Sequence, residues 1–112
     1  MIEWEISLFG WPIHLQAERL DEGIHVLLTG GCKRHIGAVS VAEPGKPPET
    51  LTFPGHKDQY ISEPWAKALS EKIGERVCVV CGIHYDNATG AQIAEIVEKT
   101  NEMLQKLMQT DL

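Results

Sequence analysis

Apolar and polar residues alternate with a period of two through most of the first 40 positions, and this pattern restricts the possible folds more than any other feature of the chain. The alternation is clear at residues 2–8 and 13–17, and turn-forming residues separate the two runs. Because successive side chains of a strand point to opposite faces, each run predicts a strand with one face on a core. Further strands are expected at 24–29 and 36–41. The pattern indicates an antiparallel meander of four strands.

The middle of the chain changes from strand patterns to a helical one. Residues 43–49 hold three prolines and one glycine, so they predict an exposed loop, and a short strand is expected after it at 51–53. An apolar stripe with three- to four-residue spacing then predicts a helix. This helix is expected to begin near Asp58 or Ser62 and to end at Gly74.

The last third of the chain combines a short apolar run with a well-capped helix. The run VCVVC at 77–81 is apolar on both faces, so it predicts a central strand covered above and below. Thr89 and Gln92 have the spacing of a capping box, which predicts the start of the final helix. The apolar residues of this helix are expected to share one face and to pack in the core: Ile93, Ile96, Val97, Leu104, Leu107 and Met108.

These elements predict an α+β fold with a mainly antiparallel β-sheet of about six strands packed with two α-helices. The expected element order is β-β-β-β-β-α-β-α. A chain of 112 residues is long enough for one hydrophobic core and too short for two ordinary domains. We therefore expect a single domain that spans residues 1–112.

Composition limits the function classes. A formal net charge of −6 argues against nucleic acid as a general partner, because phosphate binding needs a cationic face. The longest apolar runs are only a few residues, so we expect neither a signal peptide nor a membrane span, and we expect a cytoplasmic protein. Three cysteines are too few for a secreted disulfide framework, which indicates reduced thiols.

Cations gather in one part of this acidic chain. Between Gly30 and Lys57 there are four cations and two acids, whereas the rest of the chain holds six cations and fourteen acids. Gly30 and Gly31 let backbone amides approach a ligand closely, and Lys33 and His35 add charge, which together suit a phosphate or carboxylate. A hairpin turn with solvated cations explains the same residues. No P-loop or dinucleotide-binding fingerprint is present.

Two further segments carry candidate binding residues. In GIHYDNATG, residues 82–90, the exit of the buried strand meets the start of the capped helix, where amides and the helix dipole attract an anion. His84 and Asp86 are two positions apart, so their side chains point the same way if the strand continues. The segment PGHKD places His56 and Lys57 ahead of the first helix. Turn formation or a plain loop position explains Asp86 and His56 as well.

The histidines of these segments also make metal binding a hypothesis. Three imidazoles, His35, His56 and His84, with an open position would match a catalytic zinc site, but nothing in the sequence fixes their distances, so we assign no metal ligands. Cys78 and Cys81 have CxxC spacing. Residues three apart in a strand point to opposite faces, so core packing is their expected role.

Together the segments TGGCKRHIGAV, PGHKD and GIHYDNAT, followed by an amphipathic C-terminal helix, resemble the LpdD-like prenylated-flavin chaperone family. The resemblance runs in order and spacing from about Thr29 to the C-terminus. It implies a homodimer similar in fold to eukaryotic proteasome assembly chaperones. It also implies a non-enzymatic carrier of reduced prenylated FMN that delivers this cargo to an apo UbiD-type decarboxylase. The family pocket corresponds here to Gly30, Gly31, Lys33, His35, His56, Lys57, His84 and Asp86.

This function agrees with the residues themselves, because a flavin phosphate needs amides and cations and the isoalloxazine ring needs an apolar wall. We expect Lys33, His35 and the glycine amides to hold the phosphate, and His84 and Asp86 to contact the ring or the ribityl chain. A hairpin strand or the last helix is expected to form the dimer. One alternative is a small enzyme with His84 and Asp86 as an acid–base pair, or a metal-dependent enzyme. The other is a protein-assembly module that binds a partner subunit and no cofactor.

Overall fold

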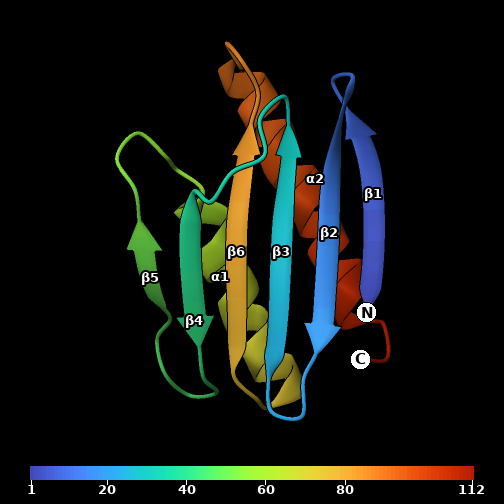
Figure 1. Ribbon diagram of the computed structural model, residues 1–112, viewed down its shortest axis with the longest axis vertical. Helices are drawn as coiled ribbons and strands as arrows, with labels where there is room; N and C mark the ends of the chain where they lie inside the picture. The colour runs from blue at the N-terminus through green and yellow to red at the C-terminus, as the bar shows by residue number, and fades with distance from the viewer.

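The computed structural model describes residues 1–112 and contains six strands and two helices (Figure 1). In chain order the elements are β1 (Ile2–Leu8), β2 (Trp11–Arg19), β3 (Ile24–Gly31), β4 (Ala38–Ala42), β5 (Glu49–Thr52), α1 (Gln59–Ile73), β6 (Val77–His84) and α2 (Gly90–Met108). The α+β class and the predicted element order are confirmed. Neither helix combines the length and the apolar character needed to cross a membrane.

All six strands form one sheet in the order β1-β2-β3-β6-β4-β5. β6 pairs parallel with β3 and antiparallel with β4, and the remaining pairs are antiparallel. The predicted meander of four strands is therefore wrong after the third, because β6 lies between β3 and β4. The physical reason is that β6 carries apolar side chains on both faces and gains most from a central position. The alternation in β4 fixes its exposed and buried faces but not its neighbour.

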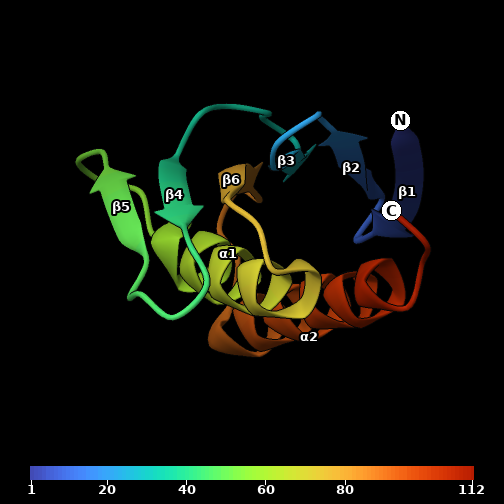
Figure 2. The same cartoon turned by 90° about the horizontal axis from the view of Figure 1, so that it is seen from below.

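Both helices pack on the same face of the sheet (Figure 2). On the helix side, Val79 and Cys81 of β6 are completely buried, whereas Cys78 and Val80 on the opposite side are only half-buried. The prediction that this strand is covered above and below is therefore wrong. We call the uncovered side the open face. One row of apolar side chains crosses it over four strands: Leu27, Val80, Val39 and Leu51.

The helix ends follow the sequence signals. α1 begins directly after Asp58, and Gly74 ends it in the left-handed conformation with φ of 71°. Thr89 and Gln92 form the predicted capping box, with the Gln92 amide donating to Thr89 Oγ1 at 3.2 Å and the Thr89 amide donating to Gln92 Oε1 at 2.9 Å. The capping box satisfies amides at the start of α2 that have no partner within the helix.

The core prediction for α2 is partly wrong. Ile96, Leu104 and Leu107 are buried as expected, but Ile93 is 53% exposed and Val97 is 44% exposed. The reason is that the first turns of α2 extend beyond the part of the helix that packs on the sheet, so these two apolar side chains face a hollow rather than the core.

The segment between β3 and β4 runs over the open face of β6 at Gly82 (Figure 1). We call residues 32–37 the crossing loop. The Cys32 amide donates to the His84 carbonyl at 2.8 Å, and the Gly37 amide donates to the Cys81 carbonyl at 2.9 Å. A Cβ added to Gly82 would fall on the His35 carbonyl, so only glycine lets the loop lie this close. The crossing also explains why the strand predicted at 36–41 begins only at 38.

The crossing loop generates a stability prediction. Gly82→Ala places a methyl group on the loop backbone, so we expect the free energy of unfolding to fall by about 1–3 kcal/mol, measured by urea denaturation. The matched control is Gly90→Ala, because an added Cβ there meets nothing within 4 Å. Equal stability of the two variants would contradict the observed crossing.

Candidate functional site

The residues predicted for the site gather around one end of the sheet, where β3 and β6 end (Figure 1). β3 ends with Gly30 and Gly31, and the crossing loop follows with Lys33 and His35. The loop before α1 carries His56 and Lys57, and the end of β6 with the turn after it carries His84 and Asp86. Three segments that are distant in sequence therefore meet here.

A groove of about 280 Å³ lies between the loop before α1, the end of β6 and the start of α2. One rim is polar and consists of His56, Lys57, Asp58 and His84. Gly55 also lines the groove. The other lining residues are mainly apolar, and we call them the apolar wall: Tyr60, Ile61, Ile83, Tyr85, Ala88, Ile93, Ile96 and Val97. The groove thus combines one cation, two imidazoles and a carboxylate with hydrocarbon and aromatic surface.

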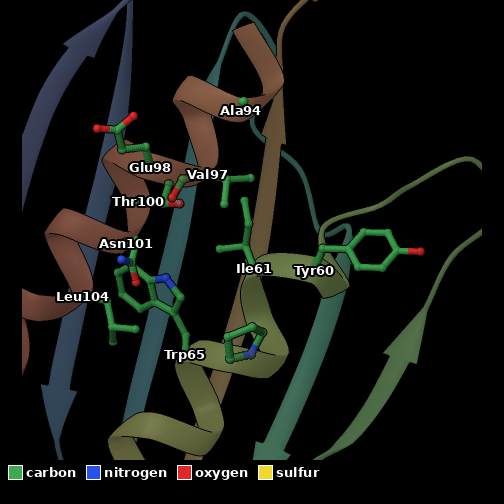
Figure 3. Close-up of a pocket in the computed structure, with 10 residues that line it drawn as sticks. Tyr60, Ile61, Trp65, Ala94, Val97, Glu98, Thr100, Asn101 and Leu104 are labelled. Atoms are coloured by element: carbon green, nitrogen blue, oxygen red, sulfur yellow. Dashed lines mark hydrogen bonds between the residues drawn. The ribbon is translucent and has the colours of Figure 1, made fainter. Parts of the chain in front are cut away.

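A second hollow, of about 270 Å³, continues the apolar wall between α1 and α2 (Figure 3). It shares Tyr60, Ile61 and Val97 with the groove. Ile61 and Val97 point into the space between the helices, whereas the Tyr60 ring extends away from α2 (Figure 3). Tyr60 is 68% exposed and also lines the groove, so its side chain is accessible to a ligand there.

His35, His56 and Asp58 form a compact cluster beside the groove, which we call the histidine–aspartate cluster. His35 Nε2 lies 3.1 Å from Asp58 Oδ2, and His56 Nδ1 lies 4.0 Å from the same oxygen. The two imidazole rings are stacked at a tilt, with centroids 4.6 Å apart. The crossing loop and the loop before α1 are therefore joined through one carboxylate.

The carboxylate of Asp58 is nearly buried, at 6% exposure, and a buried charge needs partners. Its Oδ1 accepts a hydrogen bond from the Ile83 amide at 3.0 Å and lies 3.9 Å from the Cys81 thiol, which donates to it. The side chain makes no capping bond to α1, although Asp58 occupies the cap position. A Cβ on Gly37 would collide with this carboxylate, so the crossing loop needs glycine there.

A second cluster joins Cys32, the first residue of the crossing loop, with His84 and Asp86. His84 Nε2 lies 2.9 Å from Asp86 Oδ1, and the Cys32 thiol donates to the His84 carbonyl at 3.3 Å. The hydrogen bond from His84, followed by one from Cys32, lowers the pKa of Asp86. Asp86 is exposed, so this cluster is a solvated polar rim rather than a desolvated catalytic centre.

The two glycines of the corner are strand residues. Gly30 and Gly31 pair with Ile83 and His84 in the parallel ladder, so the hairpin-turn alternative is wrong. Gly31 has φ of 78°, and a Cβ there would fall on the His84 carbonyl. Gly31 therefore permits β3 and β6 to approach closely, whereas an added Cβ on Gly30 would meet the β2 backbone at Pro12 and Ile13.

Neither the site role of Asp58 nor the residues of the apolar wall could be predicted from the sequence. Asp58 was assigned only to the start of a helix, because an aspartate at that position normally caps it. Ile93 and Val97 were assigned to the core by their periodicity. No local signal separates an apolar residue that faces a groove from one that faces the sheet.

The fold and groove are those of a small α+β domain with a one-sided sheet, and comparison with known proteins identifies its family. The family model of the prenylated flavin chaperone LpdD-like domain matches residues 8–110. Protein LpdD of Lactiplantibacillus plantarum is 33% identical over 104 residues, which covers 88% of this chain and 76% of that protein. The chain therefore belongs to the LpdD-like prenylated flavin chaperone family.

Among solved structures, a similar chain occurs in the crystal structure of a novel chaperone complex for yeast 20S proteasome assembly. The TM-score is 0.49 and the sequence identity is 16%, with 96% of this chain and 95% of that chain covered.

The environment of the cysteines generates a labelling prediction. Burial, and secondly the Asp58 carboxylate, raise the pKa of the Cys81 thiol well above its ordinary value. We therefore expect iodoacetamide at mildly alkaline pH to modify Cys32 in the folded protein and to reach Cys81 only after unfolding, as mapped by peptide mass spectrometry. Labelling of both thiols at similar rates in the folded protein would contradict the buried position of Cys81.

Proposed function

We propose that this protein binds reduced prenylated FMN as cargo and delivers it to an apo UbiD-type decarboxylase, without catalysing a reaction of its own. Membership of the prenylated flavin chaperone family supports the class of function. The observation that carries the proposal is the groove, which places a polar rim and a mainly apolar wall within one hollow. A flavin mononucleotide has the same two parts, an anionic phosphate and a flat, largely apolar ring system.

The rim and the wall suggest how the flavin lies. His56, Lys57 and His84 face the groove and form the proposed phosphate side. Ile83 and Ile93 belong to the apolar wall and form the proposed support of the ring. Exposed apolar side chains that gather in a hollow are typical of a binding surface, because a ligand removes them from water.

The remaining predicted residues take outer positions in this proposal. Lys33, His35 and Asp86 do not line the groove, and His35 instead holds the crossing loop through Asp58. Gly30 and Gly31 allow β3 to lie close to β2 and to β6, respectively.

The size of the groove agrees with a carrier. Sites that enclose a whole ligand usually measure roughly 300–1,000 Å³, and this groove lies just below that range, at about 280 Å³. A flavin held here leaves part of its surface accessible. Partial enclosure favours release to a client enzyme, because fewer contacts must break during transfer.

The enzyme alternative depends on the pair of His84 and Asp86, whose side-chain atoms lie 2.9 Å apart. Their side chains are 47% and 76% exposed, so water screens their charges. Catalytic acids and bases usually sit in clefts that shift their pKa by burial, and this pair lacks such burial. We therefore favour the non-enzymatic function.

We further assign the protein to the cytoplasm as a homodimer. Its three cysteines are free, which is typical of proteins in a reducing compartment. For the dimer we favour the open face over the hairpin strand or the last helix, because the main apolar side of α2 already packs on the sheet. The apolar row of the open face, by contrast, ends at Leu51, which is 68% exposed.

Flavin retention tests the proposed function. Under anaerobic conditions, the protein should retain reduced prenylated FMN through gel filtration, as measured by absorbance. Lys57→Ala and Ile93→Asp should each weaken binding at least about tenfold, or about 1.4 kcal/mol, because they remove a cation from the rim or place a charge on the wall. Lys72→Ala is the matched control, because Lys72 lies in the last turn of α1, away from the groove.

Two results would contradict the flavin proposal. One is equal retention by the native protein and both groove variants. The other is a native protein that retains no flavin but co-purifies with a decarboxylase subunit, which would favour the assembly module.

The dimer is tested by light scattering coupled to gel filtration. Leu51→Glu places a charge in the apolar row of the open face, so we expect the dimer to dissociate at least about tenfold more readily. Leu20→Glu is the control, because Leu20 is 47% exposed and lies in the turn after β2. A native monomer, or a Leu51→Glu dimer as stable as the native one, would contradict this interface.

A further inference from the structure

Two imidazoles converge on one carboxylate oxygen in the histidine–aspartate cluster. His35 Nε2 and His56 Nδ1 lie 3.1 Å and 4.0 Å from Asp58 Oδ2. One nitrogen of each ring and a carboxylate oxygen all lie within 4.8 Å of one another. Three groups that can donate electron pairs therefore surround a single point beside the groove.

The hydrogen bonds of His35 indicate that a cation belongs at this point. His35 Nδ1 lies 3.1 Å from the Lys33 carbonyl, which can only accept, so this nitrogen carries the hydrogen. In a neutral imidazole the other nitrogen then holds a lone pair, and it faces a carboxylate that also only accepts. A proton on Nε2 or a bound metal ion removes this conflict.

Asp58 leaves one oxygen available for such a cation. Its Oδ1 already accepts from the Ile83 amide and the Cys81 thiol, whereas Oδ2 faces only the two imidazoles. No lysine or arginine forms an ion pair with this nearly buried carboxylate. A proton on His35 Nε2 would join that ring alone to the carboxylate, whereas a metal ion at this point would join both rings to it.

We propose that His35, His56 and Asp58 bind a divalent transition-metal ion of the zinc type. Zinc bonds of about 2.0–2.2 Å to nitrogen and oxygen place tetrahedral ligand atoms about 3.3 Å apart, so small side-chain rotations complete the site. Imidazole and carboxylate ligands suit this class of ion. The Lys33 carbonyl accepts a hydrogen bond from the second ring nitrogen of His35. Such a hydrogen bond is common for a metal-ligating histidine, because it fixes the tautomer of the ring.

The cluster of Cys32, His84 and Asp86 is the competing metal site in this chain. Its members are more exposed, and the short contact from His84 to Asp86 is a simple hydrogen bond at 2.9 Å. His56 and Asp58 also line the groove, so the remaining coordination positions of an ion in the histidine–aspartate cluster are accessible from it.

The test uses the metal alone and no flavin, so its outcome is independent of the proposed function. Protein stripped with a chelator and dialysed is titrated with Zn²⁺ by calorimetry and with Co²⁺ by absorption spectroscopy. We expect one ion per chain and a Co²⁺ spectrum without a thiolate charge-transfer band. His56→Ala and His35→Ala should bind at least about tenfold more weakly.

Two control variants complete the experiment. His25→Ala removes an exposed histidine at the opposite end of β3, and Cys32→Ser removes a ligand of the competing cluster; both should bind like the native protein. His56 lies in a loop with a side chain 39% exposed, so its variant should keep the native melting temperature. Absence of Zn²⁺ binding by the native protein would overturn the proposal. So would unchanged binding by His56→Ala and His35→Ala, or loss of binding only in Cys32→Ser.

Discussion

The nearly buried carboxylate of Asp58 holds together the three segments on which the site depends. It accepts from the Ile83 amide of β6, meets His35 of the crossing loop and lies at the start of α1. An isolated buried charge is costly, so each partner is needed to stabilise the others. Without this junction, nothing in the hydrogen-bond network would tie the crossing loop to the first helix.

The position of β6 in the sheet follows from the path of the crossing loop. The chain leaves β3, crosses β6 at Gly82 and returns as β4, so β6 is enclosed between two earlier strands. Both helices then lie on the opposite face (Figure 2), and the first turn of α2 extends past the ends of β3 and β6 (Figure 1). The groove forms where the start of α2 and the loop before α1 meet the end of β6, and its mainly apolar wall includes the exposed Ile93 and Val97 of α2.

Much of the fold could be predicted from the sequence because the signals are local. The period-two runs, the glycine at the end of α1 and the capping box of α2 each depend on residues that are neighbours in the chain. The position of β6 between β3 and β4 could not be predicted fully, because strand alternation describes faces and not partners. The two-faced apolar run identified β6 as central but not the side on which the helices pack.

Only part of the candidate site could be predicted, because local signals identify side chains but not their contacts across the fold. His56, Lys57 and His84 were identified from their chemistry and their places at junctions, and the structure brings them to one groove. Asp58 was missed because its carboxylate acts across the fold rather than on its own helix. Ile93 and Val97 were assigned to the core because helical periodicity alone cannot show where a helix extends past the sheet.

The central claim is that the groove is where the flavin binds. Amide resonances followed by ¹⁵N-correlated NMR during anaerobic titration with reduced prenylated FMN test it most directly. The account predicts that the largest shifts occur at Lys57, His84 and Ile93, while Val41 and Glu49 on the sheet change little. Shifts concentrated on Val41 and Glu49, with the groove amides unchanged, would contradict it.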